Sequence, residues 1–549
     1  MASNVRNPLL LPEISRHIGF LCPDVARKLA YTCKSLFHSV IPVVWEEVYF
    51  VEQIMALIPG VRFVREFGTG MNNKGMTKYI VLDNSTLDGD WSRYWYYAPL
   101  VKRLKLFAPQ VLDDYNLLIR GWHILFLKLR EGVLLPNLCV LNIEGLRMHA
   151  SFDRITWSAL FLSPSLQELD INDATNVYLV DPQLPTYPLY FLLGALIEKL
   201  PCSSNASLSI SYQPPSEDIL ASLYPNEYQQ GYHWFSRIPD LSRLQELGIT
   251  VFPLPETVRD ALCITGCLPL LRRLRLEFMV DWDFEIGLDS EGQYDCDKLP
   301  PLHSNLFPSL RRLHLGRVPY FSLYQWIWSL SPLVSGLSSA CIDRQEFGFS
   351  PEEYRVNVVR PIHENSPSLN ALSVFVADLK MGALETTCEI LSQIPLKELE
   401  LHCMRYWGLF PATYSGSTFP HLQRFIIQAP LGIEHWPTII QVAKALPNLE
   451  FLYIWPYIRT FALIGYVGID QIALQKIKIE VQRPFLGDAC TNEGWDEAVL
   501  SVLGFLRAIW PNALISTLGW ASPTISPQKT SFGNQTDQLW NRSANNLCL

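Results

Sequence analysis

The stretches PLLRRLRL (residues 269–276) and PSLRRLHL (residues 308–315) decide the fold of this 549-residue chain. Both follow the form Pro-x-Leu-x-x-Leu-x-Leu, in which aliphatic residues can replace one another. The last two aliphatic residues of each block stand two positions apart, which places them on one face of an extended strand. Each block therefore predicts a short strand with one buried face, followed by a return segment of about 20 residues.

The same block returns along most of the chain. Strong copies begin at Leu138, Leu166, Leu244, Leu271, Leu310, Leu369, Leu396, Leu422 and Leu449, and weaker copies at Val101, Asn205, Leu337 and Leu474. Their spacing is about 27 residues, with occasional insertions of about 12. A proline precedes the first leucine by two residues in seven of the nine strong copies, which suits the start of a strand.

Because one such unit cannot bury its aliphatic row alone, we expect the units to stack into a parallel-stranded, curved solenoid. An ordinary α/β enzyme with similar strands is the competing interpretation. The blocks resemble leucine-rich repeats in a degenerate form that lacks the regular Asn or Cys, over about residues 99–481. The expected fold is therefore α/β, with a solenoid of about 12–13 units over residues 99–516 and a disordered tail over residues 517–549.

The composition favours a packed interior and excludes several classes of protein. Hydrophobic residues make up 49% and charged residues 18%, and the formal net charge is −9, so we expect no nucleic-acid partner. No secretory signal and no apolar run of bilayer length is found, which predicts a cytoplasmic or nuclear protein without membrane association. The twelve cysteines form no C-x-x-C pair, and we expect them to be reduced, mostly buried and free of metal.

Residues 8–50 differ from the repeats and predict a helical module. One helix is expected to carry Ile14, Ile18 and Leu21 on an apolar face. A second helix, capped by Asp24 and ended by Pro42, is expected to carry Leu29, Cys33, Phe37 and Val40. By periodicity alone, this module could be an end cap that packs on the first repeat. Residues 51–98 are expected to be a connecting region and first cap.

The segments LPEISRHIGFL, VARKLAYTCKSLFHSV and VVWEEV resemble the F-box, although Ser35 and Leu36 stand where an aromatic or arginine is usual. The resemblance implies docking on a Skp-type adaptor and, through it, on a cullin. The implied adaptor-binding residues are Leu11, Pro12, Ile14, Ile18, Leu29, Cys33, Phe37, Val40 and Trp45. Some of these must instead hold the module together. The implied function is the substrate-recognition subunit of an SCF-type ubiquitin ligase.

The alternating positions of the predicted strands provide candidates for substrate binding. Positions three, five and seven of each block are expected to face the concave side of the solenoid. Arginine and aromatic side chains dominate binding energy at protein interfaces. We therefore expect a protein substrate to be bound through Arg273, Arg275, Arg312, Tyr453 and Trp455. A solvated face with a carboxy-terminal aromatic cap is the alternative.

Two further clusters have a structural and a functional interpretation. The aromatic run of residues 91–97 could stack nucleic-acid bases, but nearby aspartates favour a seam between the module and the first repeat. Asp281, Asp283 and Glu285 could hold a hard cation, although their place in an insertion favours a solvated loop.

The chain contains no phosphate loop, dinucleotide fingerprint, nucleophile elbow or H-E-x-x-H motif, so we expect neither catalysis nor a cofactor. Two functions compete. One is a substrate receptor that works by holding its target near a recruited enzyme. The other is a non-ligase repeat scaffold whose helical module is only an end cap. Adaptor binding would separate these two. A third option, an enzyme whose catalytic residues are scattered along the chain, would require a pocket of converging polar groups.

Overall fold

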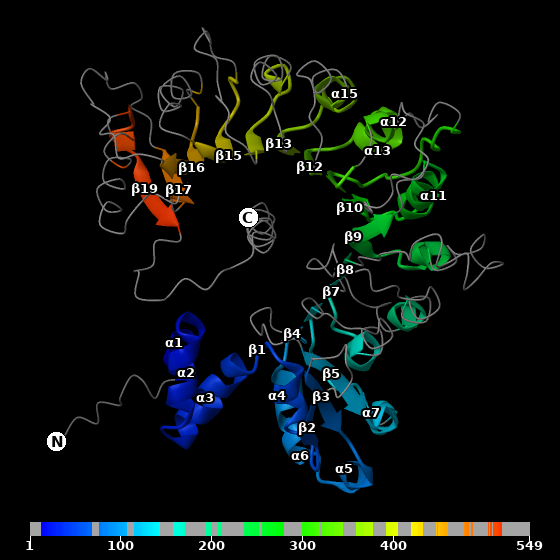
Figure 1. Cartoon of the computed structure of the whole chain (residues 1–549), viewed down its shortest axis with the longest axis vertical. Helices are drawn as coiled ribbons and strands as arrows, with labels where there is room; N and C mark the ends of the chain where they lie inside the picture. The colour runs from blue at the N-terminus through cyan, green and yellow to red at the C-terminus, as the bar shows by residue number, and fades with distance from the viewer. Residues whose placement is uncertain are drawn as a thin grey trace. The chain divides into compact units, whose positions relative to one another are not determined.

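The chain is an α/β protein with extensive parallel pairing of strands in its computed structural model (Figure 1). The structure describes residues 12–67, 76–106, 115–130, 132–142, 157–170, 193–198, 206–209, 235–251, 255–278, 299–318, 321–343, 358–376, 391–403, 419–431, 446, 448–458, 477–482, 485–486, 503, 506–507 and 509–518. Two compact units are present: unit 1, Met1–Thr250 with Lys529–Leu549, and unit 2, Val251–Gln528.

Unit 1 begins with three helices: α1 (Pro12–Leu21), α2 (Pro23–Ala30) and α3 (Lys34–Val44). Their core contains Ala26, Leu36 and Val40, and α1 approaches α2 closely at a glycine. A Cβ atom added at Gly19 would lie 3.3 Å from the Cβ of Ala26. The small residue at this position therefore allows the two helices to pack at short range.

The prediction of one second helix was wrong, because α2 and α3 are separated by a short turn. The apolar spacing continues through this turn, which explains the error. Asp24 lies inside α2, and the residue before the helix, Cys22, makes no side-chain cap. Pro42 lies inside α3 and does not end it. A proline removes only its own N–H from the helix, and the N–H of Trp45 still donates to the Ile41 carbonyl at 3.0 Å.

The larger sheet of unit 1 is parallel and follows the chain order of its strands. They are β1 (Glu47–Val48), β4 (Arg103–Lys105), β6 (Val140–Asn142), β7 (Glu168–Asp170), β8 (Ala206–Ser209) and β9 (Leu244–Val251). The register aligns Val48, Leu104, Leu141, Leu169, Leu208 and Leu247. The predicted register is confirmed here, and β1 adds a strand within the segment predicted to be the helical module.

Residues 51–98 were predicted to be a connecting region, but they contain most of a second sheet. Its strands are β2 (Arg62–Phe67), β3 (Met76–Val81) and β5 (Tyr115–Arg120); the helices nearby in sequence are α4 (Val51–Met55), α5 (Asn84–Asp88), α6 (Ser92–Tyr97), η2 (Ala98–Leu100) and α7 (Trp122–Leu129). Strand β5 comes from the long interval between the first two blocks. The interval is therefore long because it supplies this strand and α7.

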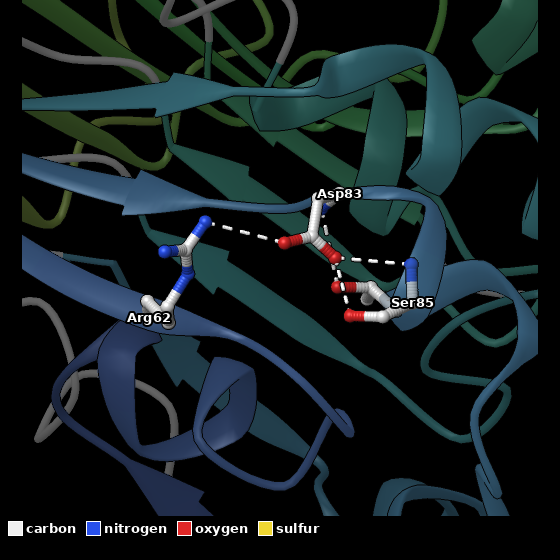
Figure 2. A network of polar contacts seen from close by, with 4 residues as sticks. Arg62, Asp83 and Ser85 are labelled. Carbon is white, nitrogen blue, oxygen red and sulfur yellow. Dashed lines mark hydrogen bonds and ion pairs between the residues drawn. The ribbon is translucent and has the colours of Figure 1, made fainter.

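The Asp83 carboxylate joins two elements of this small sheet region. It caps α5 by accepting hydrogen bonds from the backbone N–H and the hydroxyl of Ser85, and it pairs with Arg62 of β2 (Figure 2). The Asp83 oxygen lies 3.2 Å from the Arg62 nitrogen. The hydroxyl of Ser85 and the other hydrogen bonds lower the pKa of Asp83. This cluster has a structural role as a helix cap.

The aromatic run of residues 91–97 packs as the predicted seam. The ring of Tyr97 lies 4.6 Å from that of Trp45, and the hydroxyl of Tyr96 lies 3.4 Å from Nδ1 of His38. Trp91 and Tyr94 are buried and donate hydrogen bonds to backbone carbonyls. The module is thus attached to the aromatic run of α6, elsewhere in unit 1, through contacts near the end of α3.

The described residues of unit 2 contain ten strands in parallel pairings. They are β10 (Arg273–Phe278), β11 (Arg312–Gly316), β12 (Ser339–Asp343), β13 (Ala371–Val376), β14 (Glu398–Cys403), β15 (Arg424–Leu431), β16 (Phe451–Ile458), β17 (Lys478–Gln482), β18 (Phe485–Leu486) and β19 (Leu514–Leu518). Strand β18 pairs only with the end of β16, and the others follow chain order.

Helices lie on one side of the unit 2 strands (Figure 1). They are α11 (Pro255–Gly266), α12 (Phe321–Ser329), α13 (Ser331–Val334) and α15 (Arg360–Asn365); the 3-10 helix η4 (Phe235–Asp240) belongs to unit 1. Polar and apolar residues alternate along these strands, and the apolar residues are buried. Leu274 and Leu313 are examples, and they pair in register. The aliphatic blocks therefore form the core on the leucine side of the sheet.

Two predictions at the end of the repeat region were wrong. Leu452 pairs with Ile479, whereas the block placed at Leu474 would pair it with Ile477. The observed register restores a spacing of about 27 residues. Residues 517 and 518 belong to β19, whose Ile515 pairs with Ile479, and not to a tail. The rest of the predicted disordered tail lies outside the described residues.

Neighbouring repeat blocks are joined by a repeated backbone pattern. One carbonyl accepts the N–H groups of two successive residues of the next block, as the Arg272 carbonyl does from Arg311 and Arg312, both at 2.9 Å. The Asn370 carbonyl accepts from Lys397 and Glu398 in the same way. Each block therefore provides a hydrogen-bond acceptor for the backbone N–H groups at the start of the next strand.

A side-chain ladder repeats beside the backbone pattern. The residue after the block proline donates to the carbonyl of the preceding block's proline. The four donor–acceptor pairs are Asn137–Pro99, Ser165–Pro136, Ser309–Pro269 and Asn448–Pro420, at 2.7–3.1 Å. The block proline lies in the turn before the strand, so the prediction that it starts the strand was wrong. We refer to these contacts as the proline ladder.

Two further observations concern the described residues only. Cys22, Cys33 and Cys267 are exposed, and the other described cysteines are half-buried, so the prediction of buried cysteines was wrong there. These described cysteines form no disulfide. No helix in the described ranges combines the length and hydrophobicity needed to span a bilayer.

Candidate protein-binding surfaces

The unit 2 sheet has a polar face opposite its leucines. Along β10, the half-buried residues Arg273, Arg275 and Glu277 alternate with buried Leu274 and Leu276. The same alternation occurs in β12. Because successive strand residues point to opposite faces, the residues in register with Arg273, Arg275 and Glu277 share one face of the sheet. We call this the polar face.

The register divides the polar face into three rows. The first row, from β10 to β19, is Arg273, Arg312, Ser339, Ala371, Glu398, Arg424, Phe451, Lys478 and Leu514. The second row is Arg275, His314, Cys341, Ser373, Glu400, Ile426, Tyr453, Glu480 and Ser516. The third row begins with Glu277, Gly316 and Asp343 and reaches His402.

Glu277 is the centre of a network on β10 and β11. Its Oε1 lies 2.7 Å from Nε of Arg275 and 3.3 Å from Nε2 of His314. A Cβ atom at Gly316 would overlap the Glu277 carboxylate, so this glycine makes room for the network. Burial disfavours the charged carboxylate, but the charge of Arg275 and the hydrogen bond to His314 outweigh it and lower the pKa of Glu277.

Asp343 extends this network to β12. Burial and the charge of Glu277 raise the pKa of Asp343. Its Oδ1 is buried and has no hydrogen-bond partner among the described residues. The backbone N–H of Arg317 donates to the Asp343 carbonyl at 2.8 Å, with Arg317 in the left-handed region at φ 55°. A non-glycine residue in this conformation is strained, and such strain concentrates at functional positions.

Strand β14 carries a second carboxylate–imidazole pair. Oε1 of Glu400 lies 3.0 Å from Nε2 of His402, and both side chains are largely buried. Burial acts against the charged form of Glu400, but the hydrogen bond and charge of His402 outweigh it and lower the pKa of Glu400. Burial raises the pKa of the neighbouring Glu398, although the charge of Arg424 opposes this. The charged groups Arg275 and Glu400 of the second row are therefore paired with Glu277 and His402 of the third row.

Cations flank an aromatic ring on β15 to β17. The Arg424 guanidinium carbon lies 4.3 Å from the ring centre of Phe451, and Nζ of Lys478 lies 5.7 Å from it. Lys478 also pairs with Glu480 at 2.6 Å. Tyr453 is only 5% exposed, and burial raises its pKa. Phe451 is therefore the more accessible of these two rings.

The predicted substrate-binding residues occupy different environments. Arg273 and Arg312 pair in register on the first row, as the block spacing predicts. Arg275 lies in the Glu277 network, and Tyr453 is buried, so neither presents a simple exposed contact. Trp455 lies on β16, and its side chain is outside the described part of the chain.

Sequence reasoning missed Glu277, Arg424, Lys478 and Asp343. The first two stand at positions seven and three of their blocks, so the rule applied to the other blocks would have found them. Lys478 and Asp343 stand at positions five and seven of the weaker blocks at Leu474 and Leu337, where the rule was not applied. The burial of Asp343 needed the structure, because it depends on neighbouring strands such as β11.

The helical module presents an apolar surface of its own. The buried residues of α1 are the small Ser15 and Gly19, whereas three of its four large aliphatic or aromatic residues, Ile14, Phe20 and Leu21, are exposed. Phe20 is 72% exposed and Tyr31 is 92% exposed. The other large exposed residues of α1 and α2 are Ile14, Leu21 and Val25. We call these five residues the apolar face of the module.

The predicted adaptor residues divide between this surface and the core. Pro12, Ile14 and Cys33 are exposed, and Ile18, Leu29, Phe37 and Trp45 are half-buried. Val40 is fully buried, so it belongs to the module core. Leu11 lies outside the described residues. Phe20, Val25 and Tyr31 were absent from the predicted set, because exposure of an apolar residue cannot be read from spacing alone.

The described residues contain no group of three or more His, Cys, Asp or Glu arranged to hold a metal ion. The predicted acidic cluster Asp281, Asp283 and Glu285 lies outside the described residues. A scan against protein-family models and a search of curated proteins each returned no match to this chain.

Proposed function

We propose that this chain is the substrate-recognition subunit of an SCF-type ubiquitin ligase. In this proposal, the helical module is an F-box that docks on a Skp-type adaptor and, through it, on a cullin. The parallel strands form a leucine-rich-repeat-like solenoid that binds a protein substrate. The chain itself carries out no catalysis, and a recruited partner supplies the ubiquitin chemistry in the cytoplasm or nucleus.

One observation carries this proposal: the large apolar residues of α1 point outward while its small residues face the core. A helix that served only as a cap would bury its large apolar side chains against the first strands. Contiguous exposed apolar surface marks interaction sites in soluble proteins. The aromatic seam at Trp45 and Tyr97 already attaches the module to unit 1, which leaves the apolar face for a partner.

The stacked units support the second half of the proposal. Apart from β18, the strands of the larger parallel sheets lie in chain order, as expected when a repeat contacts mainly the next repeat. The polar face combines arginines with an aromatic ring, and these residue types are enriched at protein interfaces. A protein substrate bound there would be held by the same chain that binds the adaptor.

The competing function is a repeat scaffold that binds proteins without a ligase. Its support is the polar face alone, because that surface needs no adaptor to act. The two functions differ in what the module does. In the scaffold, changes to the apolar face of the module leave every interaction of the chain unchanged.

Co-expression with a Skp-type adaptor, followed by size-exclusion chromatography, tests the proposal. We expect a stoichiometric complex with the wild-type chain. The double variant Ile14→Ala, Phe20→Ala should lose it, because removal of anchoring aromatic and aliphatic side chains costs about 2 kcal/mol or more at an interface. Phe126→Ala is the matched control, since Phe126 is an exposed aromatic on α7, outside the module.

Val40→Ala provides a second comparison, because this change removes a buried group from the module core. It should lower the stability of the module without altering the contact surface directly. A folded chain that forms no complex with the adaptor would refute the ligase assignment. A complex that survives the Ile14 and Phe20 changes would show that the adaptor docks on a different surface of the chain.

A further inference from the structure

We propose that the first row of the polar face binds an extended, carboxylate-rich segment of the protein substrate, lying across the amino ends of the strands. The row is defined by the paired residues from Arg273 on β10 to Lys478 on β17. This inference rests on the proposed function, because it names the substrate chemistry of the same surface.

Charge is separated along the strand direction. The first row from β10 to β17 carries the cations Arg273, Arg312, Arg424 and Lys478, and a single carboxylate, Glu398. The second row over the same strands carries Arg275, Glu400 and Glu480 besides His314. The third row carries Glu277 and Asp343 besides His402. Positive charge is therefore concentrated at the amino ends and negative charge at the carboxyl ends.

Two of the cations are direct neighbours. Arg273 and Arg312 pair in register on adjacent strands, which lie about 4.8 Å apart. Both arginines also interact with other groups of the chain. Like charges at such positions disfavour folding, and further carboxylates from an acidic ligand would add favourable charge interactions. Ser339 and Ala371 follow in the same row and are small. An arginine fork binds a carboxylate through two hydrogen bonds, so this end of the row suits two or more acidic side chains.

The spacing of the other cations describes the rest of the segment. From Arg312 on β11 to Arg424 on β15 is four strand spacings, about 19 Å, which an extended chain covers in about six residues. Lys478 lies two strands further, about 10 Å or three residues. Phe451 stands between these two cations, with the Arg424 group 4.3 Å from its ring. A partner residue with an apolar side chain would fit against this ring.

A narrow chain fits this pattern better than a nucleic acid. The acidic second and third rows, with Glu400, Glu277 and Asp343, lie beside the basic row. Two residues along a strand separate neighbouring rows by about 7 Å. A wide polyanion would place phosphates over these carboxylates, where like charges repel. An extended peptide can follow the first row alone.

Fluorescence polarisation with the full chain, without adaptor, tests the inference. The probe is a labelled peptide of about twelve residues with Glu at alternate positions, long enough to span the row. We expect binding that weakens as salt rises and is lost when Gln replaces Glu. The double variant Arg273→Glu, Arg312→Glu should bind on the order of tenfold more weakly or worse. Arg360→Glu, on α15, is the matched control and should bind normally.

A Gln peptide that binds as well as the Glu peptide would overturn the inference, as would tighter binding of single-stranded DNA of equal charge. If the double charge reversal misfolds, Arg273→Gln with Arg312→Gln replaces it; unchanged affinity in that folded variant also overturns it. The adaptor assay is independent. A chain that binds adaptor but not peptide refutes only this inference, and one that binds peptide but not adaptor refutes only the ligase assignment.

Discussion

At the scale of single residues, the polar face of unit 2 depends on the space that Gly316 leaves for the Glu277 carboxylate. The variant Gly316→Ala would place a methyl group where this carboxylate lies. Glu277 would have to move away from Arg275 and His314, and we expect the free energy of unfolding to fall by about 1–3 kcal/mol. Urea unfolding followed by circular dichroism measures the change.

Gly336→Ala is the control for that experiment. Its added Cβ atom would lie 3.3 Å from the end of the Arg311 side chain, which can adjust, and 3.5 Å from the Leu310 carbonyl oxygen, an ordinary van der Waals contact. A fall in stability of equal size in both variants would show that loss of glycine, and not the Glu277 network, is responsible.

The lowered pKa of Glu277 predicts a pH dependence of stability. Because the folded chain favours ionised Glu277, this residue stabilises the fold above its unfolded pKa, about 4.3, and the contribution is lost as pH falls toward the lower folded pKa. The stability difference between wild type and Glu277→Gln should therefore be constant near neutral pH and shrink in acid below about pH 4. Urea unfolding at a series of pH values measures it. A difference that grows on acidification would contradict the assignment.

Residue spacing predicted which side chains share the polar face, but it could not predict their environments. Arg273 and Arg312 are in register as expected. Tyr453 was expected to be an accessible anchor, yet its side chain is buried among neighbours on other strands. The spacing of one strand determines the direction of a side chain, whereas burial depends on what adjacent strands contribute.

At the scale of elements, the proline ladder explains the Asn or Ser that follows the block proline at residues 137, 165, 309 and 448. The side chain of Asn448 donates a hydrogen bond to the carbonyl of Pro420 in the preceding block, at 2.7 Å. Asn448→Ala should lower the free energy of unfolding by about 0.5–1.5 kcal/mol, the usual contribution of one hydrogen bond. Asn370→Ala is the control, because Asn370 is exposed and stands at the start of β13. Thermal unfolding of both variants compares them; equal shifts would refute a role for the ladder.

Elements were predicted with uneven success, for identifiable reasons. The strands follow from paired aliphatic residues two apart, and Leu274 and Leu313 align as that pattern requires. The helical module was predicted as two helices, because the turn between α2 and α3 preserves the apolar spacing. Strand β5 was missed because it pairs with β3, outside the repeat pattern. Local periodicity identifies an element, but not a pairing with a distant partner.

At the scale of the whole molecule, parallel strands that pair in chain order should respond locally to damage. Leu313→Ala removes a buried side chain from β11 and should cost about 2–5 kcal/mol. Because β11 pairs with β10 and β12, amide hydrogen exchange should increase most in these three strands and little in β4 or β6 of unit 1. Leu141→Ala in β6 provides the reciprocal control. Uniform loss of protection over both units would contradict this expectation.

The α/β class and the parallel stacking of units were predictable at this scale, because the repeat period reports how neighbouring units pair. The small sheet of β2, β3 and β5 was not, since its strands carry no repeat. The division into two compact units was also beyond the pattern, because the block passes from unit 1 to unit 2 without a change in its form.

The proline ladder has a consequence for how such a chain can change in length. The block that contains Pro136 and Asn137 offers both an acceptor, the Pro136 carbonyl, and a donor, the Asn137 side chain, to its two neighbours. If this block were duplicated or deleted, the new neighbours would still present a matching donor and acceptor. A recombination event of this kind keeps this side-chain contact, so the number of blocks can vary here without leaving these polar groups unpaired.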